Sequence, residues 1–206
     1  YKIVTVSKEM ENEVRKQLGY QNLKTIYNIV DVGNITNLSE VGTPEKTDFP
    51  YIVVLGRMAS YNIKQQDEII KAYSQSVLPE KGIRLLLLGE GDKRNDFEQL
   101  AKDLNLSDKV IFIGFKSNPY PYLKNAKFMI LASKSEGFPN VILESFACGT
   151  PVVSFDCKTG PNEMIQHEQN GLLVKDQDFE DLIKAMNLMI EDAELYYFCK
   201  SNTLKT

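Results

Sequence analysis

Residues 51–57 read YIVVLGR, an unbroken apolar run that ends at a glycine and an arginine. Five more strand-length apolar runs follow along the chain, at residues 84–88, 109–113, 128–131, 151–155 and 172–174. Strands that are apolar along their whole length are typical of a sheet that is buried on both faces. The runs therefore predict a sheet with helices packed on each side of it.

The segments between these runs carry apolar residues at the i, i+3, i+4 spacing of amphipathic helices. The clearest examples are residues 69–73, 97–104 and 179–190. Regular alternation of strands and helices predicts an α/β fold in which a doubly wound parallel sheet occupies residues 51–206. We interpret the apolar stripes of these helices as core-facing.

The first 50 residues have a different pattern. A strand near 2–6, a helix near 8–18 and a strand near 24–29 make one β-α-β unit, which we assign to residues 1–31. Residues 32–50 are rich in Gly, Thr, Ser, Asn and charge and lack apolar periodicity, so we interpret them as a linker between domains. Because the chain begins at Tyr1 rather than Met, we expect it to be a piece of a longer protein.

Composition limits the classes of partner. The 24 Lys and Arg against 28 Asp and Glu give a formal charge of -4, without a long basic run, so nucleic acid is not an expected partner. The three cysteines have no metal-ligand spacing or disulfide pattern, which favours a reducing cytoplasm. No apolar run approaches the roughly 20 residues of a membrane-spanning helix.

Glycines and charged residues follow several of the predicted strands. Gly56-Arg57 follows the first strand of the main sheet, Gly89-Glu90-Gly91 the second, and Gly114-Phe115 the third. Because ligands of an open parallel sheet bind at the carboxyl ends of its strands, we expect a site at this edge. Gly89 and Gly91 are also explained by an ordinary turn, and we leave them out of the predicted site.

The richest segment is SEGFPNVILESFACGTPVV, residues 135–153. Glu136 lies in a loop after a strand, and a helix is expected to begin near Asn140 and to run to about Cys148. Free N–H groups at such a helix start, together with the helix dipole, favour a diphosphate. Glu144 lies about one turn into the helix on the face of Asn140, where its carboxylate suits a diol such as ribose.

Two cations are candidates for neutralising a leaving diphosphate. Arg57 directly follows a strand, and Lys64 lies at the start of the next helix. Arginine offers a bidentate fork and lysine a point charge. Since the chain also lacks a DxD-like acidic pair in a suitable loop, we predict chemistry without a metal or any cofactor.

Two glutamates separated by seven residues, Glu136 and Glu144 in EGFPNVILE, followed by ACGTPVV, resemble the signature of the retaining GT-B glycosyltransferases called the glycosyl transferases group 1 family. Further matches over residues 51–190 are GR at 56–57, Lys64 beside Gln65-Gln66, LLLLGEGD at 85–92, VIFIGF at 110–115, NPYPYLKNA at 118–126 and NGLLV at 170–174. Residues 5–31 resemble the last β-α-β unit of the family's acceptor domain.

The resemblance implies a role for each matching residue. Glu144 would hold the ribose, Glu136 the hydroxyls of the donor sugar, and Arg57 with Lys64 the diphosphate. Backbone N–H groups from Phe138 to Val141 would assist. The implied nucleotide-sugar contacts are Gly56, Phe115, Lys116, Gly137, Phe138, Asn140, Val141 and Glu144, with Phe115 and Lys116 bordering the base.

The implied fold is the Rossmann-like carboxyl-terminal domain of a GT-B enzyme with a remnant of the amino-terminal domain. The implied reaction is metal-independent transfer, with retention, from a nucleotide-sugar to a polysaccharide, lipopolysaccharide or lipid-linked glycan. FDCKTGPNEMI, residues 155–165, resembles members that use UDP-sugars. The implied location is the cytoplasm, at the inner face of the plasma membrane, with peripheral attachment through the missing domain.

Two other functions remain open at this point. One is a nucleotide-binding module without catalysis, and the other is a sugar phosphorylase or epimerase on the same fold. We also expect the chain by itself not to turn over, because catalysis needs donor and acceptor together in a cleft between two domains.

Overall fold

Each of the six apolar runs matches a strand to within one residue at either end in the computed structural model of the protein, which describes residues 2–205. Tyr1 and Thr206, which bound the predicted units 1–31 and 51–206, lie outside the described residues. The strands are β3 (Tyr51–Leu55), β4 (Arg84–Leu88), β5 (Val110–Gly114), β6 (Met129–Leu131), β7 (Val152–Phe155) and β8 (Gly171–Val174). They form one sheet in the order β5-β4-β3-β6-β7-β8, and all neighbouring pairs are parallel, which confirms the predicted Rossmann-like fold.

The order of the strands reverses at β3. Val53 of this strand pairs with Leu86 of β4 on one side and with Met129 of β6 on the other. In a doubly wound sheet, the loops that leave two such strands diverge to opposite faces and open a crevice at their carboxyl ends. The loops after β3 and β6 therefore border the expected ligand crevice.

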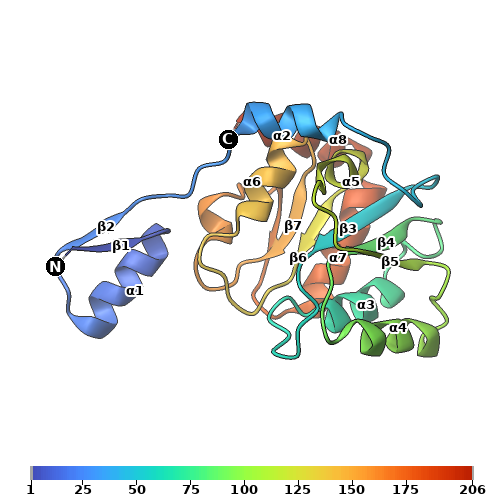
Figure 1. Ribbon diagram of the computed structural model, residues 1–206, viewed down its shortest axis with the longest axis horizontal. Helices are drawn as coiled ribbons and strands as arrows, with labels where there is room; N and C mark the ends of the chain where they lie inside the picture. Colours follow the sequence, from blue (N-terminus) through green and yellow to red (C-terminus); the bar gives the residue numbers. More distant parts are fainter. Residues whose placement is uncertain (1, 206) are drawn as a thin grey trace.

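Side chains of β3 alternate between two apolar clusters. Ile52 and Val54 belong to one cluster, together with residues of α3 (Gln66–Gln75), α4 (Arg94–Asp103) and α7 (Phe179–Glu191). Tyr51 and Val53 belong to the other, with residues of α5 (Tyr120–Asn125) and α6 (Asn140–Ala147). Figure 1 shows the sheet between these two helical layers, with α8 (Ala193–Asn202) following α7. Burial on both faces explains why the strand sequences do not alternate in polarity.

Residues 3–25, which we call the N-terminal unit, form a separate β-α-β arrangement. Its elements are β1 (Ile3–Thr5), α1 (Lys8–Leu18) and β2 (Leu23–Thr25), and the two strands are parallel. The predicted second strand at 24–29 was too long, because β1 ends at Thr5 and offers no partner beyond Thr25. An extended segment then leads from β2 to the main domain (Figure 1).

Residues 32–50, which we interpreted as a linker, contain a helix in their first part, α2 (Val32–Ser39). Asp31 caps this helix, since its Oδ1 accepts a hydrogen bond of 2.9 Å from Asn34 N. Ile35 is only 4% exposed and joins the cluster that α5 and α6 form. The helix is therefore stabilised by tertiary packing of a side chain that the local sequence does not single out.

The three cysteines are free thiols and all are buried. Burial raises the pKa of Cys148 and Cys157 to about 12 and that of Cys199 to about 11, so none is primed as a nucleophile. Within residues 2–205, no helix combines the length and the apolar composition that crossing a membrane requires.

Candidate functional site

Two cavities lie at the carboxyl edge of the sheet, next to the switch point. The larger cavity has a volume of about 570 Å³, and its lining includes the predicted Gly56, Arg57, Phe115 and Lys116. The smaller cavity has a volume of about 360 Å³, and its lining includes the predicted Arg57, Lys64, Glu136 and Gly137. Arg57 lines both cavities, so the two spaces adjoin at this residue.

Lys64 and Glu136 face each other across the smaller cavity. Lys64 Nζ lies 2.5 Å from Glu136 Oε1, and the two side chains are 26% and 13% exposed. Lys64 comes from the loop after β3 and Glu136 from the loop after β6. Their ion pair therefore links the two sides of the switch point. The loops are also joined by a hydrogen bond of 2.9 Å from Lys134 N to Ile63 O. A cation and a carboxylate are thus held side by side in a partly buried space.

Arg57 differs from Lys64 because, among residues 2–205, it has no ion pair and acts on a carboxylate only at longer range. The pKa of Asp92 is lowered, against the effect of burial, by hydrogen bonds with its own backbone and Ser60 and then by the charge of Arg57. The Arg57 side chain is exposed, and no acidic group among residues 2–205 lies within ion-pair distance of it. Its backbone is fixed instead, because Gln66 Nε2 donates a hydrogen bond of 3.1 Å to Arg57 O. A free guanidinium on a fixed backbone is suited to binding an anion bidentately.

The loop after β4 packs so closely against the loop after β3 that two of its positions, Gly89 and Gly91, have no room for a side chain. A Cβ atom on Gly89 would lie 2.1 Å from Gly56 O, and one on Gly91 would lie 2.0 Å from Met58 O. Both glycines line the larger cavity, so leaving them out of the predicted site omitted two residues that shape it. The Gly-x-Gly spacing after a strand is the sequence feature that could have indicated these two residues. The same spacing also occurs in ordinary turns, and only the close approach to the backbone of the loop after β3 distinguishes the two cases.

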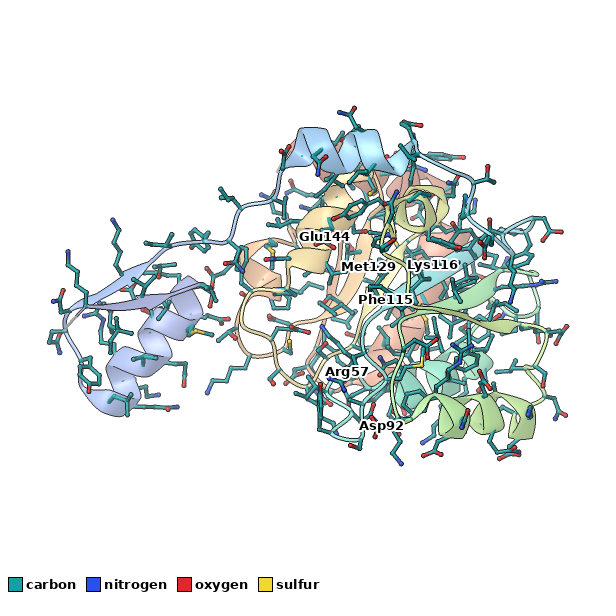
Figure 2. The ribbon with its side chains drawn as sticks, in the orientation of Figure 1. Arg57, Asp92, Phe115, Lys116, Met129 and Glu144 are labelled. Atoms are coloured by element: carbon teal, nitrogen blue, oxygen red, sulfur yellow. The ribbon has the colours of Figure 1, made fainter. Side chains whose placement is uncertain are left out.

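Phe115 and Lys116 form the outer wall of the larger cavity. Phe115 is 74% exposed, and Lys116 Nζ pairs with Glu45 Oε2 at 3.0 Å. The hydrogen bond to Glu45 raises the pKa of Lys116. Figure 2 shows Phe115 and Lys116 between Arg57 and Glu144 in the view. An exposed ring beside a cavity of this size gives a planar ligand such as a base a surface to stack on.

Helix α6 begins at Asn140 as the sequence predicted, and no side chain caps its first turn. Glu144 lies one turn into the helix and is half-buried. Burial raises the pKa of its carboxyl group. The pKa of Tyr120 is raised by burial and, next, by the negative charge of Glu144, which places the two groups near each other.

Four predicted contact residues, Phe138, Asn140, Val141 and Glu144, are not among those that line either cavity. The ring of Phe138 lies 5.4 Å from that of Tyr27, and Asn140 Oδ1 accepts a hydrogen bond of 2.9 Å from Asn28. The side chains of Phe138 and Asn140 are therefore engaged by the segment that follows the N-terminal unit. Contacts between residues more than 100 positions apart leave no signal in a local motif.

Comparison with known proteins identifies the family. The sequence profile described as Glycosyl transferases group 1 matches residues 37–206. The chain belongs to this family. The matched range covers the whole main sheet and both cavities, and it begins within α2.

Relatives in this glycosyltransferase family include enzymes of bacterial glycan assembly. The chain is 34% identical over 172 residues to N-acetylgalactosamine-N,N'-diacetylbacillosaminyl-diphospho-undecaprenol 4-alpha-N-acetylgalactosaminyltransferase of Campylobacter jejuni, covering 82% of the chain and 45% of the relative. It is 32% identical over 179 residues to the lipopolysaccharide core biosynthesis glycosyltransferase LpsE of Rhizobium meliloti, covering 86% of the chain and 51% of the relative. The chain therefore spans about half the length of these relatives.

Solved structures of glycosyltransferases share the fold. HepE of Anabaena, in complex with UDP, superimposes with a TM-score of 0.84 at 22% identity, covering 99% of the chain and 58% of HepE. The similarity extends over the N-terminal unit as well as the main sheet, because nearly the whole chain is covered. At this identity the likeness shows a shared fold and no more.

Proposed function

We propose that this chain provides the donor-binding part of a retaining glycosyltransferase that transfers a sugar from a UDP-linked donor to a polysaccharide, lipopolysaccharide or lipid-linked glycan. The observation that carries the proposal is the position of Arg57 between two cavities, one beside Phe115 and Lys116 and the other beside Lys64 and Glu136. A nucleotide-sugar has three parts in the same order: a planar base with its ribose, a doubly charged diphosphate and a polyhydroxylated sugar.

Each part of the donor matches a part of the site. The nucleoside occupies the larger cavity, where Phe115 offers its ring. Glu144, one turn into α6 and outside the lining of that cavity, accepts hydrogen bonds from the ribose hydroxyls that extend beyond it. The diphosphate lies at Arg57, and the uncapped first turn of α6 is a further source of N–H donors for it. The sugar occupies the smaller cavity, where Glu136 accepts hydrogen bonds from its hydroxyls.

The chemistry follows from where charge develops. When the bond between the anomeric carbon and the diphosphate oxygen breaks, negative charge accumulates on the diphosphate, and Arg57 and Lys64 stabilise it. The acceptor hydroxyl attacks the same face of the sugar and passes its proton to the departing diphosphate oxygen, so the configuration is retained. Two cations and helix N–H groups supply the positive charge, so neither a divalent metal nor any other cofactor is needed.

The relatives support the substrate classes in this proposal. The Campylobacter jejuni and Rhizobium meliloti relatives are named for lipid-linked and lipopolysaccharide substrates, and HepE has been solved with UDP-glucose. Acceptors of these kinds are built at the inner face of the plasma membrane, where we place the protein, in the cytoplasm. The comparisons do not favour the alternatives, a non-catalytic nucleotide-binding module and a sugar phosphorylase or epimerase.

Titration calorimetry of the chain with UDP, UDP-glucose and GDP tests the donor assignment. We expect UDP and UDP-glucose to bind, GDP to bind more weakly, and Arg57→Ala to weaken UDP binding on the order of tenfold. Arg84→Ala is the matched control, because Arg84 begins β4 at the opposite edge of the sheet. Equal UDP affinity in the two variants would remove the basis of the proposal.

A chelator separates the metal-independent reaction from a metal-dependent one. In the full-length protein, sugar transfer should proceed at the same rate with and without EDTA. A rate that falls with EDTA and recovers with added Mg²⁺ or Mn²⁺ would contradict the metal-independent mechanism while leaving donor binding intact.

A further inference from the structure

Glu163 binds the N-terminus of a helix that lies more than 150 residues away in the sequence. Its Oε2 accepts a hydrogen bond of 2.8 Å from Lys8 N, and its Oε1 accepts one of 2.9 Å from Glu9 N. Ser7 provides acceptors for the next two N–H groups of α1, those of Met10 and Glu11. Half of the first-turn donors of α1 are therefore satisfied by the helix's own cap and half by a carboxylate of the main domain.

The same carboxylate is linked to the loop between β6 and α6, residues 132–139, which we call the β6–α6 loop. Tyr27 donates a hydrogen bond of 2.9 Å to Glu163 Oε2. The Tyr27 ring also packs against an aromatic residue of the loop, because it lies 5.4 Å from the ring of Phe138 at an interplanar angle of 43°. Glu163 thus fixes the ring that packs on the β6–α6 loop.

The segment that carries Glu163 also supports the β6–α6 loop directly. Thr159 donates a hydrogen bond to Glu136 O. Gly160, at φ 101°, packs so closely that a Cβ atom would lie 2.7 Å from Pro139 Cδ and 3.1 Å from Gly137 O. The segment therefore contacts the backbone of the residue whose side chain pairs with Lys64.

Other contacts hold the N-terminal unit in the same place. Lys158 Nζ lies 2.7 Å from Glu13 Oε2, and Asn162 donates a hydrogen bond of 3.1 Å to Glu9 Oε1. A Cβ atom on Gly137 would lie 3.3 Å from Met10 Cε, so α1 reaches the β6–α6 loop itself. Exposed contacts of this kind are individually weak, and the two charge-assisted bonds of Glu163 are the strongest candidates to decide the arrangement.

We propose that Glu163 is a positioning residue that holds the N-terminal unit against the β6–α6 loop and thereby sets the placement of Glu136 toward the donor sugar. The assignment of Glu136 to the sugar rests on the proposed function, whereas the coupling between α1 and the loop does not. Glu163 touches neither cavity, so it acts through Tyr27, Phe138 and the segment from Thr159 to Gly160.

Hydrogen–deuterium exchange of the 206-residue chain, without ligand, tests the coupling. We compare Glu163→Ala, which removes both acceptors, with Glu163→Gln, which keeps one, and Tyr27→Phe, which keeps the ring but removes its hydroxyl group. The control is Glu168→Gln, since Glu168 lies five residues further on and is exposed, with its Oε1 3.7 Å from His167 Nε2.

We expect amides of residues 8–10 and of residues 136–141 to exchange faster together in Glu163→Ala, by threefold or more, with a smaller increase in Glu163→Gln. Tyr27→Phe should accelerate exchange at 136–141 with little effect at 8–10, and Glu168→Gln should match the unsubstituted chain. Faster exchange at 8–10 alone in Glu163→Ala would reduce Glu163 to a helix cap and overturn the proposal.

Kinetics of the full-length protein supply a second readout that a simple cap would not change. If Glu163 sets the placement of Glu136, Glu163→Ala should lower kcat about tenfold, because small displacements at a reacting centre cost rate. UDP affinity should stay within twofold, since the larger cavity is untouched. An unchanged kcat overturns the positioning role, and a chain that does not bind UDP at all instead contradicts the proposed function.

Discussion

Lys64 Nζ lies 2.5 Å from Glu136 Oε1, although 72 residues separate the two in the chain. The pair spans the switch point of the sheet, because one partner follows β3 and the other follows β6. Each charge lowers the cost of burying the other, so the smaller cavity can hold a carboxylate that is only 13% exposed. In the proposed function, a diphosphate at Arg57 draws on the charge of Lys64, which lines the same cavity, and leaves Glu136 to the sugar.

Glu136→Ala should leave UDP binding nearly intact and abolish transfer. UDP has no sugar to occupy the smaller cavity, so removing Glu136 costs the nucleotide little. Lys64→Ala should weaken UDP binding about tenfold, because a cation near the diphosphate is lost. Calorimetry with UDP and turnover of the full-length protein measure the two effects. A large loss of UDP affinity in Glu136→Ala would contradict this division of roles.

Lys64→Ala should also destabilise the chain by roughly 1–2 kcal/mol, because it leaves a partly buried carboxylate without its charged hydrogen-bond partner. The control is Lys71→Ala, since Lys71 pairs with Glu68 at 2.8 Å but both side chains are more than one-third exposed. Its loss should cost well under 1 kcal/mol. Urea unfolding followed by circular dichroism compares the two, and equal losses would show that the Lys64–Glu136 pair is no more than a surface contact.

Glu144→Gln should raise the thermal stability of the chain at neutral pH while it weakens nucleotide binding. Burial raises the pKa of Glu144, so the folded state binds a proton more readily than the unfolded state. Stability therefore falls as the pH rises from about 4.5 through the raised pKa, and the cost of the buried charge persists above it. The glutamine variant lacks this cost.

Melting temperatures between pH 4 and pH 8 check this prediction. The gain in Glu144→Gln should be largest near pH 8 and should disappear as the pH approaches 4, where the carboxyl group is protonated in both states. A gain that does not depend on pH would point to packing rather than to the buried charge.

The sequence was sufficient to predict the sheet and to place the loops after β3 and β6 at the same edge of it. Apolar runs that are buried on both faces are visible in the sequence, and the carboxyl-edge rule then places Arg57 and Glu136 at one edge. The roles assigned to the site residues stay predictions. Helix α2 was missed because its stability depends on burying Ile35 against distant helices.

The contacts of Glu163 were missed for a similar reason. Its partners Lys8, Glu9 and Tyr27 lie in the N-terminal unit and in the segment that follows it. The sequence around Glu163 is polar and does not indicate that this glutamate binds residues so far away in the chain. The roles of Gly89 and Gly91 depend on how closely two loops approach, a distance that a turn-like sequence does not encode.

Gly89→Ala should destabilise the chain and abolish UDP binding. Gly89 has φ 140°, and an added Cβ atom would lie 2.1 Å from Gly56 O, so the loop that carries Arg57 must move. We expect a loss of about 3 kcal/mol or more from the strained backbone and the displaced loop together. The control is Gly82→Ala, where φ is 69° but no atom lies within 4 Å of the added Cβ.

Gly82→Ala should cost about 1 kcal/mol from backbone strain alone and leave UDP affinity unchanged. Urea unfolding and calorimetry on both variants separate strain from the steric effect. If Gly89→Ala binds UDP as well as Gly82→Ala does, the close approach of the two loops is not needed to hold Arg57.

The N-terminal unit should come apart in acid before the main domain does. Thr25 donates a hydrogen bond of 2.6 Å to Glu11 Oε2, and this bond, with those from Lys8 and Arg15, lowers the pKa of Glu11 to about 2. A lowered pKa means that the unfolded state binds the proton more readily. The stabilisation is therefore complete above about pH 4.5 and is lost as the pH falls toward 2.

Exchange of the α1 amides, measured between pH 2 and pH 6 and corrected for the intrinsic pH dependence of exchange, should show this loss before the amides of β3 and β4 become exposed. Glu11→Gln should weaken protection of α1 at pH 6 and remove most of its further change with pH, because glutamine cannot ionise. Glu13→Gln is the comparison variant on the same helix, since the hydrogen bond from Lys158 of the main domain, rather than a contact with β2, lowers the pKa of Glu13. An acid transition in α1 that persists unchanged in Glu11→Gln would show that another carboxylate ties the helix to its strands.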